Sequence, residues 1–287
     1  MFKKILYPTD FSNYADEIFQ CIDELKAIGV EEVVYVHVVD LKTARGSASM
    51  LEENAKSLME ERKKKLEDNG LKVIIHVPTG DPAAEIIKVA EKEDVSLILI
   101  GARGKGLIRE AFLGSVSYNV MRRTAKPILV MKFKTVVRAG VLCCELIFKP
   151  MFRKILYPTD FSECSERALE YIKEAIGAGV GVAEVVIVHV VEKGETLEEI
   201  EENKRKAEAE LEGIKEVIER KGVKVKTSIT AGIASEEILR VAREENASII
   251  MMGSRGLGFV KTILYGSTSD RVVRRAEISV FLSKRPS

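Results

Sequence analysis

Residues 2–12 read FKKILYPTDFS, and residues 152–162 read FRKILYPTDFS. The two stretches lie 150 residues apart and differ only by lysine against arginine at their second position. Residues 36–39 and residues 188–191 both read VHVV at an offset of 152, so the second half carries two extra residues, which fall in the loop-like stretch 177–183. Solenoid repeats have far shorter periods, so this period predicts a duplicated whole domain.

The length and composition agree with two domains. The chain has 287 residues, of which 46% are hydrophobic and 31% are charged. A domain of about 140 residues is large enough to bury a core, so each copy can fold by itself. We expect the first domain at residues 1–134, a connector at 135–150 and the second domain at 151–287. The connector is rich in apolar residues, so we expect it to pack rather than to act as a flexible linker.

Charge and cysteine content narrow the classes of partner. Lys and Arg total 45, Asp and Glu total 44, and neither half is basic, which argues against nucleic acid as a general partner. No apolar run approaches the roughly 20 residues that cross a bilayer, and we see no signal-peptide core, so we expect no membrane partner and a cytoplasmic location. The four cysteines form no C-x-x-C pair, so neither a zinc site nor a disulfide framework is expected.

Short apolar runs alternate with longer segments of helical period in both copies, which is typical of βαβ units around a parallel sheet. The predicted fold class is therefore α/β, with an open, doubly wound sheet in each copy and ligands at the carboxyl ends of the strands. Two helices are expected to end at left-handed glycines, Leu51–Asp68 at Gly70 and Leu197–Arg220 at Gly222. The strands predicted in the first copy are Lys4–Pro8, Glu32–Val38, Lys72–Val77, Leu97–Gly101 and Ile128–Lys132.

A glycine-rich motif follows the fourth predicted strand of each copy. Its two versions, each interrupted by nine residues, are Gly101-Ala102-Arg103-Gly104 with Gly114-Ser115-Val116-Ser117, and Gly253-Ser254-Arg255-Gly256 with Gly266-Ser267-Thr268-Ser269. Glycines let backbone N–H groups approach an anion without a Cβ in the way, and a helix N-terminus supplies free donors and a favourable dipole. The motif therefore predicts a phosphate-binding site in each copy, with serine hydroxyls as further donors. The alternative is that the glycines serve only a tight strand-to-helix turn.

The spacing G-x-x-G-x9-G-S, with Pro-Thr-Asp-Phe-Ser at the end of the first strand, resembles the nucleotide-binding class of universal stress proteins in a tandem form. The resemblance covers nearly all of both copies and leaves out the connector. It implies two Rossmann-like domains of the adenine nucleotide alpha hydrolase-like type, each a five-stranded parallel sheet with helices on both faces. It also implies ATP or AMP as the bound nucleotide, with Mg²⁺ held through the phosphates in an alternative reading.

The resemblance also assigns the residues that would bind the nucleotide. Asp10 and Asp160 would contact the adenine side, together with the backbone of the preceding Pro8-Thr9 and Pro158-Thr159. Val38 and Val190 would lie near the base and the ribose. The residues implied for ribose and phosphates are Gly101, Arg103, Gly104, Gly114, Ser115, Val116 and Ser117 in the first copy, and Gly253, Arg255, Gly256, Gly266, Ser267, Thr268 and Ser269 in the second. A turn or helix-cap role is the alternative for the aspartates, and a solvated loop charge is the alternative for the arginines.

The second copy departs from the first near these motifs. Ile278-Ser279 replaces Lys126-Pro127 before the last strand, so we expect that strand to pair differently. Ile233-Ala234 replaces Asp81-Pro82 after the third strand. Both copies carry arginine in the glycine motif where many members of the resembled family have histidine.

Two histidines, His37 and His189, lie inside predicted strands and are flanked by valines. A metal site needs three or four clustered donors, and no second ligand accompanies either ring. We therefore interpret both as core or sheet-face histidines and expect no metal ligands among them.

The chain contains no Walker A sequence and no readable Ser-His-Asp or Cys-His set, which favours a binding module over an enzyme. On this interpretation, a stress-response or signalling protein binds an adenine nucleotide, and a protein partner that the sequence does not identify senses the bound state. Two alternatives stay open: slow Mg²⁺-dependent ATP hydrolysis or phosphotransfer, and an interaction scaffold with empty sites. Relatives in the resembled family associate through their last strands, which implies a pseudo-dimer within the chain and a homodimer of chains.

Overall fold

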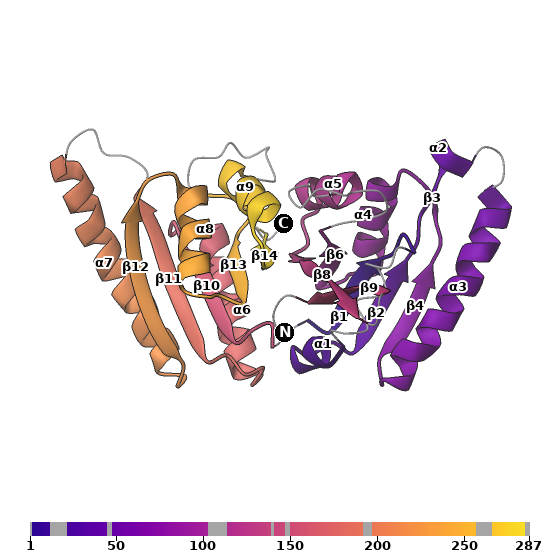
Figure 1. The fold of residues 1–287 in the computed structure, drawn as a ribbon, viewed down its shortest axis with the longest axis horizontal. Helices are drawn as coiled ribbons and strands as arrows, with labels where there is room; N and C mark the ends of the chain where they lie inside the picture. The colour runs from indigo at the N-terminus through magenta and orange to yellow at the C-terminus, as the bar shows by residue number, and fades with distance from the viewer. Residues whose placement is uncertain are drawn as a thin grey trace. The chain divides into compact units, whose positions relative to one another are not determined.

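The chain folds as two compact units, Met1–Leu146 (unit 1) and Ile147–Ser287 (unit 2). Both are α/β units that contain a mostly parallel sheet (Figure 1). The duplication in the sequence is therefore a duplication of the fold. The computed structural model describes residues 2–11, 22–44, 48–102, 114–138, 141–146, 150–191, 197–256 and 266–284.

Strands alternate with helices along both units. The elements of unit 1 are β1 (Lys4–Pro8), α1 (Ile22–Ala27), β2 (Glu32–Val36), β3 (Val39–Asp40), α2 (Leu41–Ala44), α3 (Ala48–Asp68), β4 (Lys72–His76), β5 (Thr79–Gly80), α4 (Pro82–Lys92), β6 (Leu97–Gly101), α5 (Ser115–Arg123), β7 (Ile128–Met131), β8 (Phe133–Arg138) and β9 (Val141–Leu146). The elements of unit 2 are β10 (Lys154–Pro158), α6 (Glu163–Gly177), β11 (Glu184–Val191), α7 (Leu197–Glu219), β12 (Lys224–Ala231), α8 (Ala234–Glu244), β13 (Ile249–Gly253), α9 (Ser267–Arg275) and β14 (Ser279–Ser283).

The main sheet has the same strand order in both units. Among the described residues the order is β7-β6-β1-β2-β4 in unit 1 and β14-β13-β10-β11-β12 in unit 2. All of these neighbours within a unit pair in parallel. The chain leaves the first strand in one direction and later returns to its other side, so the order switches between β1 and β6 and between β10 and β13. An open parallel sheet binds ligands outside the carboxyl ends of its strands at such a switch.

Helices cover both faces of each sheet, which explains why the strands are apolar on both sides. In unit 2, α6 packs on β13 and β14, and α7 packs on β11 and β12. On the other face, α8 packs on β11 and against α9, and both lie in front of the strands in Figure 1. Right-handed crossovers require this division, because the chain reverses direction across the sheet after β12. No helix in the described part of the chain combines the length and the apolar character that crossing a membrane requires.

The predicted strands and helix ends agree closely with the structure. β1 and β6 span the predicted residues, whereas β2 stops at Val36, because the chain then forms a separate short sheet of β3 and β5. Gly70 and Gly222 both have φ of +79°, which confirms them as left-handed residues after α3 and α7. The two extra residues of the second copy lie between α6 and β11, in the predicted loop.

The last strand of unit 2 corrects one prediction. β14 pairs with β13 in the same register as β7 with β6, since Val280 lies opposite Ile250 as Ile128 lies opposite Ile98. The expectation of a different pairing was wrong. Ser279 stands where the first copy has proline, and because serine keeps its N–H it adds one paired residue at the start of the strand.

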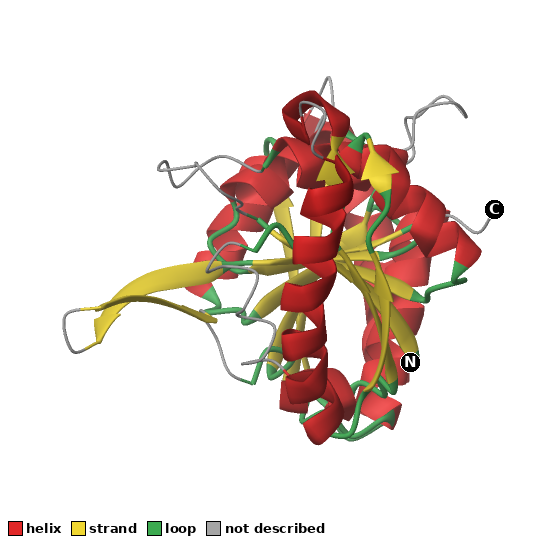
Figure 2. Ribbon diagram, turned by 90° about the vertical axis from the view of Figure 1, so that its right-hand side faces the viewer, coloured by secondary structure: helices red, strands yellow, loops and turns green. Residues whose placement is uncertain are grey.

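The stretch between the copies contains regular structure. β8 and β9 form an antiparallel hairpin, with Phe133 opposite Leu146 and Arg138 opposite Val141. Figure 2 draws it as the long pair of yellow strands at the left of the view. A hairpin satisfies most backbone hydrogen bonds along one edge of each strand, which a flexible linker would leave to water.

A cluster of ion pairs lies at the amino edge of each sheet, opposite the switch point. In unit 1, Lys4 Nζ lies 2.9 Å from Glu32 and 2.7 Å from Glu93. In unit 2, Lys154 Nζ lies 3.3 Å from Glu184 and 3.1 Å from a second glutamate, Glu245. These pairs tie the first strand to the second strand and to the turn before the fourth, which holds the strands in register at the end that carries no site.

Candidate functional site

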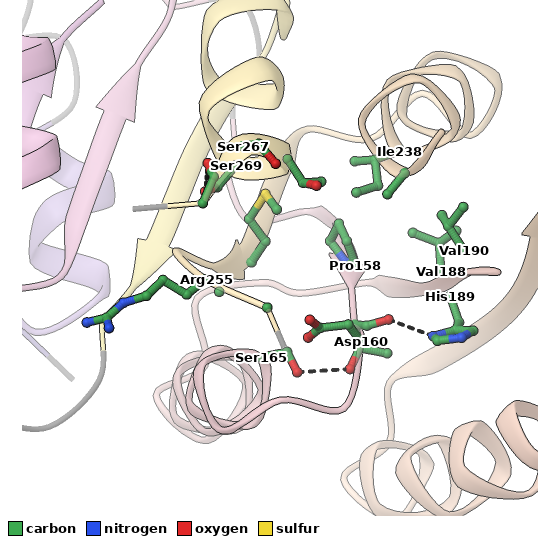
Figure 3. Close-up of a pocket in the computed structure, with 17 residues that line it drawn as sticks. Pro158, Asp160, Ser165, Val188, His189, Val190, Ile238, Arg255, Ser267 and Ser269 are labelled. Atoms are coloured by element: carbon green, nitrogen blue, oxygen red, sulfur yellow. Dashed lines mark hydrogen bonds between the residues drawn. The ribbon is translucent and has the colours of Figure 1, made fainter. Parts of the chain in front are cut away.

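A cavity of about 380 Å³ opens at the switch point of unit 2 (Figure 3). The carboxyl ends of β10, β11 and β13 form its floor, and the beginnings of α8 and α9 form its rim. Volumes of about 300–1,000 Å³ are typical of small-molecule sites. The lining residues are Pro158, Thr159, Asp160, Ser165, Val188, His189, Val190, Ala234, Ile238, Met252, Gly253, Arg255, Gly256, Gly266, Ser267, Thr268 and Ser269.

Asp160 lies two residues after the end of β10 and is held in a fixed orientation. Its Oδ1 accepts hydrogen bonds from Ser162 N at 3.2 Å and from Ser162 Oγ at 2.6 Å. The Ser162 hydroxyl also accepts from Ser165 N and so caps α6. One carboxylate oxygen therefore serves the turn, as the turn alternative predicted, and the carboxylate still lines the cavity.

Gly256 lies very close to this carboxylate. A Cβ built on Gly256 would overlap Asp160 Oδ2, so any larger residue would displace either the loop or the aspartate. The two predicted site residues, almost 100 positions apart in the sequence, thus form one structural element of the cavity wall. Glycine at position 256 lets the backbone lie against the Asp160 side chain, and it also leaves room for an anion to approach the backbone.

Gly253, at the end of β13, has a different reason to be glycine. A Cβ there would lie 2.9 Å from Cys164 C, Cys164 Cβ and Ser165 N in the first turn of α6. The helix can pack this closely on the strand only because the Cβ is missing. The prediction that Gly253 contacts ribose or phosphate stays a prediction, and the residue also has this packing role.

The N-terminus of α9 faces the cavity. Gly266 is the N-cap residue, and glycine has no side chain that could cap the helix. Its N–H donates to Ser254 O at 2.8 Å, whereas the N–H groups of the first turn lack partners within the helix. Ser267 at the first helical position is exposed, and Figure 3 shows it above the Asp160 carboxylate. Free N–H groups and the positive end of the helix dipole make this rim suited to an anion.

The second serine of each motif uses its hydroxyl inside the protein. Ser269 Oγ donates to Ser254 O at 2.8 Å, with Gly266 O at 3.0 Å, and Ser117 Oγ donates to Gly101 O at 3.0 Å. A hydroxyl has one proton, so neither side chain has a proton left for an anion in this arrangement. Both instead tie the start of the helix to the end of the preceding strand.

A histidine and a phenylalanine that we did not assign to the site support the aspartate loop in both copies. His189 Nδ1 donates to Thr159 O at 2.9 Å, and the rings of His189 and Phe161 stack at 4.7 Å. His37 Nδ1 donates to Thr9 O at 2.9 Å in the same way. A carbonyl oxygen can only accept, so Nδ1 carries a proton in both rings. The recurrence of both residue types in the two repeats was the signal that could have identified them.

The phenylalanine of this loop has an unusual backbone. Phe11 and Phe161 have φ of 56° and 60°, in the left-handed region that bulky residues seldom adopt. The stacked histidine holds each ring there, so the surrounding contacts compensate for the backbone strain. This conformation turns the chain sharply after the strand and leaves the preceding aspartate at the cavity.

Arg255 lines the cavity, but its guanidinium points away from the Asp160 carboxylate in Figure 3. Its Nε is buried and has no hydrogen-bond partner among the described residues. The structure therefore places its backbone, rather than its charge, at the cavity.

Two ionisable groups beside the cavity are neutral at pH 7. Burial raises the pKa of Tyr157 to about 12, and its hydroxyl donates to Ser165 O at 2.9 Å. Burial likewise raises the pKa of the Cys164 thiol above its usual value, with Arg255 acting in the opposite direction. Neither group is poised to act as a nucleophile or general base. Within the described ranges there is also no cluster of three or more His, Cys, Asp or Glu side chains suited to a metal ion.

Unit 1 places its predicted residues at the matching edge of its own sheet. Asp10 follows β1, and Gly114 is the N-cap residue of α5, again without a side-chain cap. Its N–H donates to Ala102 O, as the equivalent glycine of unit 2 donates to Ser254 O. Arg103 and Gly104 lie outside the described residues. The other residues predicted for this copy lie in or next to β1, β2, β6 and α5: Pro8, Thr9, Val38, Gly101, Ser115, Val116 and Ser117.

The comparison with protein families gives one match for each copy. The model of the Universal stress protein family matches residues 1–132 and residues 151–284. The stretch between the matches contains the β8–β9 hairpin.

Individual proteins and structures agree with this match. A crystal structure of a universal stress protein from Archaeoglobus fulgidus is 32% identical and has a TM-score of 0.77, covering 99% of this chain and 98% of that one. Universal stress protein MJ0577 of Methanocaldococcus jannaschii is 39% identical over 157 residues, which is 47% of this chain and 97% of that protein. Universal stress protein Slr1230 of Synechocystis is 24% identical over 284 residues, covering 96% of this chain and 88% of that protein.

Proposed function

The chain belongs to the universal stress protein family and carries two copies of its domain, and on this premise we propose that each copy binds one adenine nucleotide, ATP or AMP. The observation that carries the proposal is the cavity of unit 2. A helix start whose N-cap residue is glycine lies at one side of it, a fixed carboxylate lies at its floor, and Gly256 lies so close to that carboxylate that a Cβ would overlap it. A nucleotide needs these features together, since it presents an anionic tail and a base and ribose with hydrogen-bonding groups.

The orientation of the nucleotide follows from the chemistry of the cavity walls. Val188, Val190 and Ile238 form an apolar side suited to the flat base. Asp160 can accept hydrogen bonds from an amino group or from a ribose hydroxyl. The phosphates would lie at the N-terminus of α9, where the N–H groups of Ser267 and Thr268 and the helix dipole favour negative charge. The residues present thus suit the nucleotide at both of its ends.

The role we propose is binding rather than turnover. The buried hydroxyl of Tyr157 and the buried thiol of Cys164 are held protonated, so neither of these two groups can serve as the general base that turnover would need. A bound nucleotide stabilises the state that it binds, so a partner protein can read occupancy as a shift in conformation. We propose that this readout serves a stress response.

Titration calorimetry on the full chain tests the proposal with ATP and AMP separately. We expect two binding sites per chain, and loss of one of them in Gly256→Ala, because the new Cβ overlaps the Asp160 carboxylate. Asp160→Ala should weaken the same site by about tenfold or more, the effect of losing a charge-assisted hydrogen bond. The matched control is Gly213→Ala in α7, where a Cβ meets nothing within 4 Å.

Two results would contradict the proposal. One is a wild-type chain that binds neither nucleotide at millimolar concentration. The other is a Gly256→Ala variant that keeps both sites at the affinity of the Gly213→Ala control. Release of phosphate from ATP at a rate that Asp160→Ala and Asp10→Ala abolish would instead assign turnover to the sites.

A further inference from the structure

Unit 1 exposes a group of large apolar side chains on α2 and α3. Their exposed fractions are 61% for Leu41, 66% for Met50, 39% for Leu51 and 44% for Leu58. Leu51 and Leu58 are seven residues apart and so lie on one side of α3, next to Asn54. We name Leu41, Met50, Leu51 and Leu58 the α3 patch. Single exposed apolar residues are ordinary, but four of them on two consecutive helices indicate an interaction surface.

The second copy shows that the fold does not require the α3 patch. The residues that hold α3 on its sheet are Ala55, Met59 and Leu66, and all three are buried. At an offset of 152 the second copy has the buried residues Ala207, Leu211 and Ile218. The same offset places Lys193, Glu202, Asn203 and Glu210 at the four positions of the α3 patch. The core accepts either set, so something outside the core accounts for the apolar residues in unit 1.

A hollow beside the α3 patch gives it a shape. This cavity of about 320 Å³ lies between α3 and the segment after β2. Its walls are mostly apolar, and two residues of the α3 patch, Leu51 and Leu58, form part of them. The remaining lining residues are Phe11, His37, Val38, Val39, Asp40, Asn54 and Ala55. The same surface thus carries both protruding side chains, such as Met50, and a hollow that can receive them.

From this combination we infer that the α3 patch is the interface with a second copy of this chain. A twofold interface uses the same surface on both partners, so it must contain both the protruding part and the hollow. With the axis near Asn54, two α3 helices run antiparallel, and Leu51 of each chain meets Leu58 of the other. Met50 of each chain then lies over the hollow of its partner.

The charges at the two ends of the α3 patch complement each other in this arrangement. Lys42 on α2 is exposed beside the N-terminal end of α3, as Figure 1 shows for the two helices. Glu61 is exposed on the other side of Asn54, about 10 Å along the axis at 1.5 Å per residue. Antiparallel pairing brings Glu61 of each chain towards Lys42 of the other. Opposite charges at the rim favour this register over a parallel one.

The size of the surface predicts a modest affinity. A helix of 21 residues is about 31 Å long, and one such helix pair with a short flanking helix lies at the low end of stable interfaces. We therefore expect association of the purified chain at micromolar concentrations rather than a permanent dimer.

Sedimentation velocity of the full chain tests the interface. We expect the wild-type chain of 31.9 kDa to associate as its concentration rises. The triple variant Met50→Glu, Leu51→Asn, Leu58→Glu installs the residues of the second copy and should stay a monomer at concentrations at which the wild type associates. Val217→Glu, at a 38% exposed position of α7, is the matched control and should associate like the wild type. Equal melting temperatures show that the variants fold.

Charge reversal tests the partner and the register together. Lys42→Glu and Glu61→Lys should each weaken association several-fold, and the double variant should recover most of the wild-type affinity. A wild-type chain that stays at 31.9 kDa at all concentrations would overturn the inference, including the case in which the surface binds a different protein. A triple variant that associates as the wild type does at the same concentration would overturn it too, because association would then use another surface. Failure of the double variant to recover would overturn the antiparallel arrangement.

Discussion

The two copies agree most closely at the carboxyl ends of their first strands and differ most on their outer helices. Behind β1 and β10 the histidine-to-threonine hydrogen bond measures 2.9 Å in both units, and the following phenylalanine adopts a left-handed φ in both. On the outer helix, Leu58 of α3 corresponds to the charged Glu210 of α7. Because both copies have the same sheet order, a position whose residue type differs between them is one that the fold does not dictate.

The same comparison separates residues that serve the fold from residues that serve something else. A position that accepts both leucine and glutamate is not set by packing, whereas Ala55 and Ala207 are buried in both copies. Contacts of this kind set the residues around the aspartate loop. Gly256 lies against Asp160, Asp160 accepts a hydrogen bond from Ser162, and His189 donates one to Thr159 O. Variants made in matched pairs, one in each copy, can break or sharpen this comparison.

The largest effect is expected at the glycine that ends the fourth strand. Gly253→Ala places a Cβ 2.9 Å from three atoms of α6, so the helix must move, and we expect a loss of about 2–3 kcal/mol in the free energy of unfolding. Gly101→Ala is the equivalent change in unit 1, and we expect a similar loss if both copies pack this helix equally closely. Urea unfolding gives the free energies, and hydrogen exchange of peptides from each unit shows where the loss occurs.

Gly213→Ala serves as the control for both glycine variants. It lies in α7 with open space around its Cβ, so alanine should stabilise the helix by up to about 1 kcal/mol. A Gly253→Ala chain as stable as the wild type would show that α6 can retreat without cost. A loss in unit 2 but none in unit 1 would show that the two copies pack this helix differently.

The next largest effect concerns the histidine behind the aspartate loop. His189→Ala removes a hydrogen bond to Thr159 O and a stacked ring, which together stabilise by about 1–2 kcal/mol. His37→Ala should cost less, because the Phe11 ring in unit 1 is also contacted by Arg62 at 5.2 Å, where the second copy has Ile214. Hydrogen exchange of the residues after β1 and β10 measures both losses. Equal losses in the two units would show that the arginine adds nothing.

The sequence predicted the fold well, because the fold depends on repeated local signals, and the site residues predicted for the second copy all line one cavity of unit 2. Alternating apolar runs gave the strands, and Gly70 and Gly222 marked the helix ends. Pairing of the last strand was predicted wrongly, because the strand register depends on packing along its whole length, which a single proline position does not reveal. The contact of Gly256 with Asp160 joins residues far apart in the chain, and no local pattern contains that information.

The α3 patch was missed for a related reason. Its leucines have the spacing of an ordinary amphipathic helix, and a sequence pattern does not show which flank of the helix the sheet covers. Only the burial of Ala55, Met59 and Leu66 separates the packed side from the exposed side.

A smaller effect is expected at the starts of α4 and α8. Asp81 is the N-cap residue of α4 and accepts a hydrogen bond from Ala84 N at 2.9 Å, so Asp81→Ala should cost about 1 kcal/mol. Ile233 occupies the same place before α8, is 52% exposed and provides no cap. Ile233→Asp should therefore stabilise unit 2 by about 0.5–1 kcal/mol. Thermal unfolding of both variants tests the pair.

The smallest effect is expected at the amino edges of the sheets, and it depends on pH. Ion pairing with Lys4 lowers the pKa of Glu93, with His76 adding to the effect, and ion pairing with Lys226 and Lys154 lowers the pKa of Glu245. A carboxylate whose pKa is lower in the folded chain stabilises it above the ordinary pKa of about 4.5, and this contribution is lost as the pH falls through the lowered value. Glu245→Gln should therefore cost about 0.5–1 kcal/mol at pH 7 and less at pH 3, because the wild-type carboxyl gains its proton as the pH falls towards its lowered pKa. Glu93→Gln should cost less at pH 7. It takes a carboxylate away from one lysine and one histidine, whereas Glu245→Gln takes one away from two lysines. Urea unfolding at the two pH values measures both differences, and a cost that stays constant with pH would assign the effect to packing of the longer side chain instead of to its charge.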